Sequence, residues 1–226
     1  MPGVPVDPVL LDLPFRGRWL ARNSPARRVP SHGTHAFGVT YAIDFIRVDD
    51  QGRSSPRTWR TLFSVESPDL FRGFGEPILA PAPGTVVVAH DGEPDHEARR
   101  SQLALLPYAL GQARRVRAGA TAVAGNHVVI ALGAMGPFVL LAHLRRGSVC
   151  VRAGQVVASA DRLGECGNSG NSTQPHVHVQ VTDSTHWPTA KGLPLAFRMP
   201  EDTGSGASSR AWVPAESEIV SAQGRA

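Results

Sequence analysis

The segment from Gly167 to Val181 constrains the fold most, because a polar turn runs directly into an alternating strand pattern. The turn reads Gly-Asn-Ser-Gly-Asn-Ser-Thr-Gln-Pro and the strand reads His-Val-His-Val-Gln-Val. Side chains alternate between the two faces of a strand, so His176, His178 and Gln180 share one face and the intervening valines share the other. The valine face is therefore predicted to be core. The opposite face carries two imidazoles about 7 Å apart, which suits one metal ligand beside one catalytic group.

The composition favours a β protein rich in loops. The chain has 226 residues, which is enough for one well-buried domain. It contains 23 glycines and 19 prolines, and 6% of its residues are aromatic, which is not typical of a helical bundle. Strand patterns separated by turn residues occur at 41–46, 78–80, 85–89, 126–132 and 138–144. We expect a mainly β fold in which an antiparallel sheet forms an open cleft, with loop and helical insertions.

The chain is predicted to contain one main domain and a tail. Residues 1–200 are expected to form a single domain that begins with a hairpin over 1–31. Insertions are expected at about 49–76 and 91–120, where sequence punctuated by glycine and proline interrupts the strand patterns. The second insertion has leucines at roughly helical spacing. The last segment, 201–226, is rich in serine, glycine and alanine and is predicted to be a flexible C-terminal tail.

Charge and hydropathy argue against two classes of function. The formal net charge is +4, but the arginines are scattered, without the aromatic-interleaved basic stripe that is typical of nucleic-acid binding. The longest apolar run, 128–144, is broken by Gly133, Gly136 and Pro137, so it predicts strand, turn and strand and no membrane span. The N-terminus lacks the charged and apolar regions of a signal peptide. We therefore expect a soluble protein that is cytoplasmic as the sequence is written, while its localisation stays open. We also expect a monomer.

The cysteine content does not indicate a disulfide-stabilised scaffold. Cys150 and Cys166 are too few for a disulfide framework. In a chain without a visible export signal we expect two reduced thiols. A bridge between the two stays open as the alternative.

Four further side chains could complete a metal site beside the His-x-His pair. His32 and His35 stand in Ser-His-Gly-Thr-His, Asp44 in Tyr-Ala-Ile-Asp-Phe, and His143 in Leu-Ala-His-Leu. A hydrolytic zinc site needs three protein ligands from among His, Asp, Glu and Cys, and an open position for water. Zinc lowers the pKa of that water to about 7, so hydroxide is available near neutral pH. The sequence contains no His-Glu-x-x-His motif, which leaves histidines for proton transfer.

In this order the residues resemble the lysostaphin and LytM family of zinc peptidases, whose members cut peptide cross-links in bacterial peptidoglycan. The resemblance covers roughly residues 30–182, interrupted by the two insertions. Besides the first histidine and the aspartate, the matching motifs are Ala-Pro-Ala-Pro-Gly-Thr-Val at 80–86, Gly-Asn at 125–126, Leu-Ala-His-Leu at 141–144 and the turn and strand at 167–178. The set as a whole is specific, whereas any single motif is not.

The resemblance implies a role for each of five residues. His32, Asp44 and His178 would hold one zinc ion per chain. His143 and His176 would be the catalytic residues that line the cleft. One of them would help to deprotonate the water, and both would stabilise the oxyanion.

The first histidine departs from the usual spacing of the family. That spacing is His-x-x-x-Asp, whereas here His32 precedes Asp44 by twelve positions and His35 precedes it by nine. A branch of the family with Ser-His-Gly-Thr ahead of Tyr-Ala-Ile-Asp looks similar, and there the first histidine fits best. We prefer His32 as the ligand and keep His35 as the alternative. The loop before Asp44 must fold back for either to reach the metal.

The resemblance implies a zinc-dependent metalloendopeptidase that hydrolyses peptide bonds in peptidoglycan stem peptides or cross-bridges through a metal-activated water. Two alternatives stay open: a catalytically inactive LytM-like binding or regulatory module, and a peptidase acting on an intracellular peptide. Inactive members of the family typically lose metal ligands, and this chain keeps a full set, which favours the enzyme. Since no signal peptide is visible, action on the cell wall would require another exit route.

Overall fold

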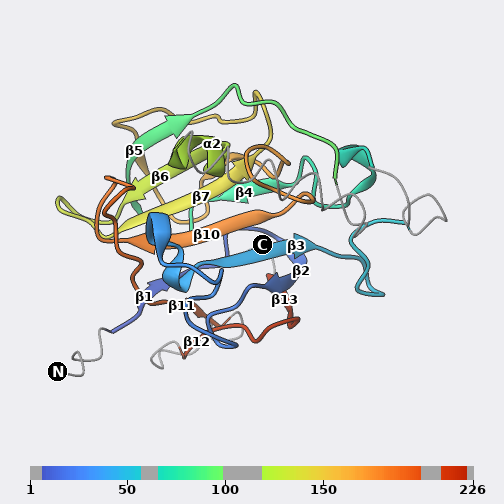
Figure 1. The fold of residues 1–226 in the computed structure, drawn as a ribbon, viewed down its shortest axis with the longest axis horizontal. Helices are drawn as coiled ribbons and strands as arrows, with labels where there is room; N and C mark the ends of the chain where they lie inside the picture. The colour runs from blue at the N-terminus through green and yellow to red at the C-terminus, as the bar shows by residue number, and fades with distance from the viewer. Residues whose placement is uncertain (1–6, 57–65, 99–118, 200–209, 223–226) are drawn as a thin grey trace.

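A large antiparallel sheet is the main element of the computed structural model, which describes residues 7–56, 66–98, 119–199 and 210–222. Every pair of neighbouring strands in this sheet runs antiparallel (Figure 1). The mainly β fold with an antiparallel sheet is therefore confirmed. In spatial order the eight strands are β13 (Ile219–Ala222), β2 (Gly17–Arg22), β3 (Ile43–Arg47), β10 (Val177–Thr182), β7 (Phe138–Leu144), β6 (Asn126–Ala131), β5 (Gly84–His90) and β8 (Val156–Val157).

Two smaller sheets and short helical segments complete the described fold. One sheet has the order β1 (Val9–Leu11), β11 (Leu195–Arg198) and β12 (Ala211–Trp212), and the other pairs β4 (Pro77–Leu79) with β9 (Arg162–Glu165). The helical segments are the 3-10 turns η1 (Ala36–Tyr41) and η3 (Pro68–Leu70) and the α-helix α2 (Ala120–Ala124). Among the helices that the structure describes, none has the length and apolarity that a membrane crossing requires.

The predicted N-terminal hairpin over 1–31 is wrong, because β1 and β2 belong to different sheets. β1 pairs in parallel with β11, whereas β2 pairs with β3 and β13 in the main sheet. Phe15, between the two strands, is fully buried and stacks on Trp19 with ring centroids 4.6 Å apart. Burial of this apolar linker carries the chain across the core instead of back along the same sheet.

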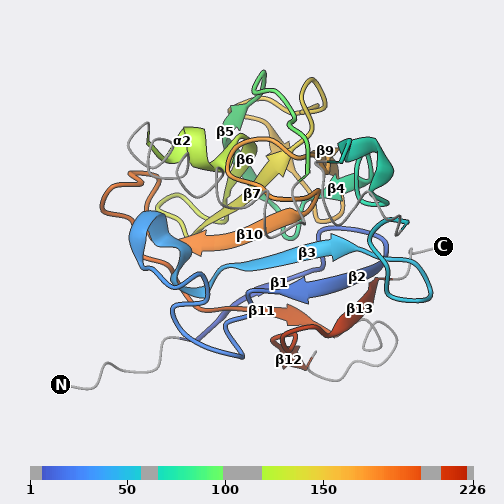
Figure 2. The same ribbon diagram turned by 45° about the vertical axis from the view of Figure 1, so that its right-hand side comes forward.

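The prediction of a flexible tail is wrong for residues 211–212 and 219–222, which form strands. β12 pairs with β11, and β13 adds an edge strand to β2 of the main sheet (Figure 2). The reason is local apolar content that the overall composition of the tail conceals, since Val220 of β13 is buried in the core.

The two predicted insertions are described only at their edges. Residues 57–65 and 99–118, which include most of the helical leucine pattern, lie outside the described residues. Within the described parts, η3 lies in the first insertion and the start of α2 at the end of the second. The division into one domain over 1–200 with insertions stays a prediction.

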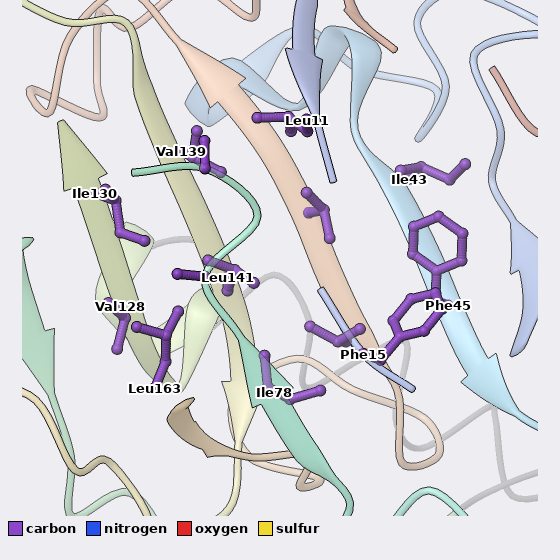
Figure 3. Close-up of a cluster of buried hydrophobic side chains, with 14 of the residues drawn as sticks. Leu11, Phe15, Ile43, Phe45, Ile78, Val128, Ile130, Val139, Leu141 and Leu163 are labelled. Atoms are coloured by element: carbon purple, nitrogen blue, oxygen red, sulfur yellow. The ribbon is translucent and has the colours of Figure 1, made fainter. Parts of the chain in front are cut away.

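The hydrophobic core lies on one face of the main sheet, which the two smaller sheets cover. Main-sheet residues such as Phe45, Leu141 and Val179 meet Leu11 of β1 and Ile78 of β4 in one cluster of buried side chains (Figure 3). Because side chains alternate along a strand, the residues between these core positions point to the other face of the sheet. That second face carries the candidate site.

Candidate metal centre

Three neighbouring strands bring the predicted site residues together. β3 carries Asp44, β10 carries His178 and β7 carries His143, and β10 lies between the other two (Figure 2). His178 lies directly opposite Asp44 in the antiparallel register. Ligand atoms of His32, Asp44 and His178 all lie within 4.8 Å of one another, and the last two residues are buried. These three residues form a candidate metal centre.

His32 reaches the sheet because its loop folds back on itself. The N–H of Ser31 donates to the carbonyl of Thr40 at 2.9 Å, which closes the loop before β3 begins. His32 Nε2 then lies 3.2 Å from Asp44 Oδ2. His35 is exposed on the same loop, with its Nδ1 3.0 Å from Thr40 Oγ1. The candidate metal centre thus includes the preferred histidine, and His35 lies outside it.

Hydrogen bonding orients the ring of His178 toward Asp44. Gln180 Nε2 donates to the carbonyl of Phe37 at 3.0 Å, so its Oε1 is left to accept from His178 Nε2–H, also at 3.0 Å. The other ring nitrogen, His178 Nδ1, lies 2.8 Å from Asp44 Oδ1. A partner of this kind on the second ring nitrogen is typical of metal-binding histidines.

His32 is arranged in the same way. Ser31 Oγ donates to the carbonyl of Val39 at 3.1 Å and accepts from His32 Nδ1–H at 3.0 Å, which leaves Nε2 facing Asp44 Oδ2. Unprotonated ring nitrogens would repel the carboxylate at these distances, so a cation, either a proton or a metal ion, is required between them. Two imidazole nitrogens and one carboxylate oxygen are ligands that catalytic zinc sites use, so the residues fit that metal.

Asn23 also contacts the carboxylate, and sequence analysis did not find it. It follows β2 with φ +50°, and its Nδ2 donates to Asp44 Oδ2 at 2.7 Å. Burial raises the pKa of Asp44, but the imidazoles of His32, His176 and His178 outweigh burial and hold this pKa well below its usual range. The carboxylate is therefore ionised. No motif around Asn23 signals its contact, which arises from the pairing of β2 with β3.

A bulge in β7 turns His143 out of the core. Asn126 pairs with Leu144 and Val128 pairs with Leu141, so one residue of β6 faces two residues of β7. His143 has φ +63°, a left-handed conformation that is uncommon for residues other than glycine. Strict alternation would place His143 on the core face with Leu141. The bulge instead lets it line the cleft, and Leu144 returns to the core.

The polar turn before β10 holds the backbone around His143. Ser169 Oγ donates to the carbonyl of Leu144 at 2.8 Å, and the Ser169 carbonyl accepts from His143 Nδ1 at 2.9 Å. Gly125 and Gly170 allow the turn to lie close to the start of β6. Both have positive φ, and a Cβ on Gly125 would lie 2.5 Å from the nitrogen of Gly170. The Gly-Asn and Gly-Asn-Ser-Gly motifs thus have a structural role.

His176 lies immediately before β10 and faces the same site. Its Nδ1 donates to the carbonyl of Gln174 at 2.8 Å, and its Nε2 lies 3.6 Å from Asp44 Oδ1. The rings of His143 and His176 have centroids 4.6 Å apart. Burial lowers the pKa of His143 well below its usual value, and the imidazoles of His176 and His178 lower it further, so this ring is neutral near pH 7.

The five predicted site residues open onto one cleft. They line a cavity of about 550 Å³, together with residues of η1, α2 and β7. A second cavity of about 310 Å³ adjoins Asp44 and His176 on the side of β2, where Arg22 and Gln174 contribute to its wall. The metal centre therefore has space beside it for a ligand.

Comparison with known proteins finds a family match over part of the chain. The model of peptidase family M23 matches residues 108–189, a segment that contains His143, His176 and His178. No curated protein sequence matches the chain significantly.

Several solved structures are similar to the chain at low identity. The catalytic domain of the antimicrobial peptidase lysostaphin from Staphylococcus simulans is 17% identical, covers 71% of this chain and 86% of its own, and has a TM-score of 0.37. A variant of the catalytic domain of the prophage-encoded M23 protein EnpA from Enterococcus faecalis is 17% identical, with coverage of 73% and 78% and a TM-score of 0.38. A putative peptidase M23 from Pseudomonas aeruginosa is 21% identical, covers 80% of this chain and 47% of its own, and has a TM-score of 0.37. Likeness at this level says nothing of the substrate.

Proposed function

We propose that this chain is a member of peptidase family M23 and a zinc-dependent metalloendopeptidase that hydrolyses peptide bonds in peptidoglycan stem peptides or cross-bridges. His32, Asp44 and His178 would hold one zinc ion per chain. The observation that carries the proposal is the approach of two imidazole nitrogens to one buried carboxylate, at 3.2 and 2.8 Å, beside an open cleft. A cation at this point removes the repulsion between the three groups.

The two remaining histidines are suited to the proton chemistry. Zinc, when bound, acts as a Lewis acid and lowers the pKa of a bound water to about 7. His143 donates its Nδ1–H to the Ser169 carbonyl, so its Nε2 is left to accept a proton in the cleft. His176 donates its Nδ1–H to the Gln174 carbonyl, which leaves its Nε2 as an acceptor too. An imidazole that has taken up a proton becomes an N–H donor and can stabilise negative charge on the attacked carbonyl oxygen.

Metal analysis paired with a peptidoglycan digest tests the proposal. We expect the purified protein to hold about one zinc ion per chain and to release peptide fragments that mass spectrometry detects. Asp44→Ala and His178→Ala should lose both zinc and activity while circular dichroism shows the fold retained. His35→Ala is the matched control: it removes an exposed histidine of the same loop and should leave zinc content and activity unchanged.

Three outcomes would contradict the proposal in different ways. Full activity of Asp44→Ala would exclude the assigned ligands. A folded, zinc-loaded protein that binds peptidoglycan fragments without cutting them would be a binding module. Cleavage of soluble peptides with intact peptidoglycan left uncut would leave the peptidase in place and assign it another peptide substrate.

A further inference from the structure

The smaller cavity, of about 310 Å³, adjoins the metal centre on the side of β2, and its wall carries a permanent positive charge. Four residues line both this cavity and the larger one: Asn23, Asp44, Thr173 and His176. A peptide bound across the metal centre therefore extends from the larger cavity toward the smaller one. Besides Asp44 and His176, Arg22 is the one ionisable side chain among the described residues that line the smaller cavity. A guanidinium of this kind stays protonated in proteins.

Strand pairing places Arg22 next to the metal centre. Arg22 is the last residue of β2 and pairs with Asp44 of β3 in the antiparallel register, and β2 lies between β3 and β13 (Figure 2). Directly opposed residues project from the same face of a sheet, so both side chains start on the cleft face. Among the described residues, the ion pairs of Asp44 are with histidines alone. The guanidinium of Arg22 therefore lies beside the site and leaves the candidate metal ligand free of it.

Glu216, in the segment between β12 and β13, holds the guanidinium of Arg22 by one edge. Its Oε1 lies 3.1 Å from Arg22 Nε and 3.9 Å from Arg27 Nη1, while its Oε2 accepts from the N–H of Ser24 at 2.9 Å. One carboxylate is thus shared between two guanidiniums, so this group of three side chains keeps a net positive charge. Because Glu216 meets Nε, the edge formed by the two Nη atoms of Arg22 is the one that a second carboxylate can meet.

The wall of the smaller cavity also supplies a neutral hydrogen-bond donor. Ser54 Oγ donates to Gln174 Oε1 at 3.4 Å, so Nε2 of the same amide is left as a donor. The carbonyl of Gln174 accepts from His176 Nδ1 at 2.8 Å, which ties this part of the wall to the site. An ionised carboxylate needs N–H donors and an opposite charge when it leaves water, and this cavity offers both.

We infer that the smaller cavity is a subsite for a carboxylate of the substrate, with Arg22 as a residue that determines specificity. The inference rests on the proposed function, because that function lays a peptide across the metal centre. A guanidinium binds a carboxylate through parallel N–H···O bonds, which fix orientation as well as adding energy. Stem peptides of peptidoglycan carry free carboxylates, whereas the interior of a glycine bridge carries none. The subsite therefore favours cleavage in or beside a stem peptide over cleavage within a glycine bridge.

Amidation of the substrate tests the inference with one chemical change. Soluble cross-linked peptidoglycan fragments with free carboxylates are divided, and carbodiimide with ammonia converts the carboxylates of one half to carboxamides. The zinc-loaded enzyme is given both, and mass spectrometry follows the products. We expect kcat/KM to be about 5- to 10-fold higher for the untreated fragments, as for an ion pair or charge-assisted hydrogen bond at a half-exposed site. High salt should lower this ratio because it screens the charges.

Arg22→Gln should abolish the preference, because glutamine has neither the charge nor the forked donors of arginine. Arg18→Gln is the matched control. Arg18 lies on the same strand, is 3.9 Å from Asp50 and lines neither cavity. Its replacement removes the same charge from the protein and should leave the ratio unchanged. Each ratio comes from one enzyme preparation, so an unfolded fraction of any variant cancels.

The outcomes separate the inference from the proposed function. Equal cleavage of the two substrates, or a ratio that Arg22→Gln does not lower, would overturn the inference and leave the peptidase standing. An equal fall of the ratio in Arg18→Gln would also overturn it, since the preference would then come from the overall charge of the protein. Cleavage of neither substrate would overturn the proposed function, and the inference with it.

Discussion

His178 and Asp44 are direct cross-strand partners in β10 and β3, and their side chains meet with Nδ1 2.8 Å from Oδ1. Strand register therefore places two of the three candidate ligands side by side. A slip of one residue would turn His178 to the core face, which Val177 and Val179 occupy. Burial of those valines stabilises one alignment of β10, so the same packing that holds the sheet together also sets the geometry of the metal centre.

Asn23→Gly should weaken zinc binding without unfolding the protein. The substitution removes the amide that donates to Asp44 Oδ2, while glycine readily adopts the φ of +50° found at this position. Loss of such a partner behind a metal ligand lowers metal affinity by about 10- to 100-fold. Competition with a chromogenic chelator measures the affinity, and Gln51→Ala, in an exposed turn, is the control. An unchanged affinity would show that the amide of Asn23 does not support the ligand.

His143→Asn should separate catalysis from metal binding. Asparagine tolerates the left-handed backbone at this position, where φ is +63°, better than alanine does. It has no imidazole to accept a proton, so we expect kcat to fall by about 10²- to 10⁴-fold while zinc content stays the same. Steady-state kinetics and metal analysis check the two effects. Retained activity would exclude His143 from proton transfer, and lost zinc would make it a ligand instead.

Removal of zinc should lower the melting temperature. Without the ion, ring nitrogens of His32 and His178 face the carboxylate of Asp44 directly, and no metal bonds hold the three side chains together. A ligand present at 100 times its Kd, bound to the folded state alone, adds about 2.7 kcal/mol to the free energy of unfolding. Calorimetry of chelator-treated protein, before and after zinc is returned, measures the difference. Asp44→Ala should show no such rise, and a rise of equal size in that variant would place the zinc elsewhere.

Cys150 should react with thiol reagents in the native protein, and Cys166 should not. Both are free thiols in the structure, with Cys150 exposed and Cys166 buried. Burial raises the pKa of the Cys166 thiol well above its usual value, and Asp95 and Glu76 raise it further, so the reactive thiolate is scarce near neutral pH. Titration with Ellman's reagent should detect Cys150 in the native chain and both thiols after unfolding. Detection of neither would indicate that the two are bridged.

Alternation along β10 could be predicted because it depends on neighbouring residues. Val177, Val179 and Val181 are buried in the core, while His178 and Gln180 line the cleft, as the pattern indicates. A period of two is a property of the extended backbone itself and needs no distant partner. The mainly β fold follows from the same signal, repeated in several strands.

His143 illustrates what alternation could not reveal. On an apolar strand its position predicts a side chain in the core, and it is the bulge against β6 that turns it to the cleft. Asn23 is a second case, since its contact with Asp44 exists only because β2 and β3 are neighbours. The N-terminal hairpin and the flexible tail failed for a related reason: which strand pairs with which depends on burial across the whole core.

The linear pattern of residues was thus sufficient to name Asp44 and His178 as candidate ligands, to assign the two faces of β10 and to give the class of fold. Folding in three dimensions determined which histidine of the 32–35 loop meets the carboxylate, how His143 enters the cleft and which amide donates a hydrogen bond to Asp44. The physical reason is the separation along the chain over which each effect acts. Side-chain alternation and residue chemistry act within a few residues, whereas register, bulges and loop closure are set by hydrogen bonds and packing between segments far apart in the chain.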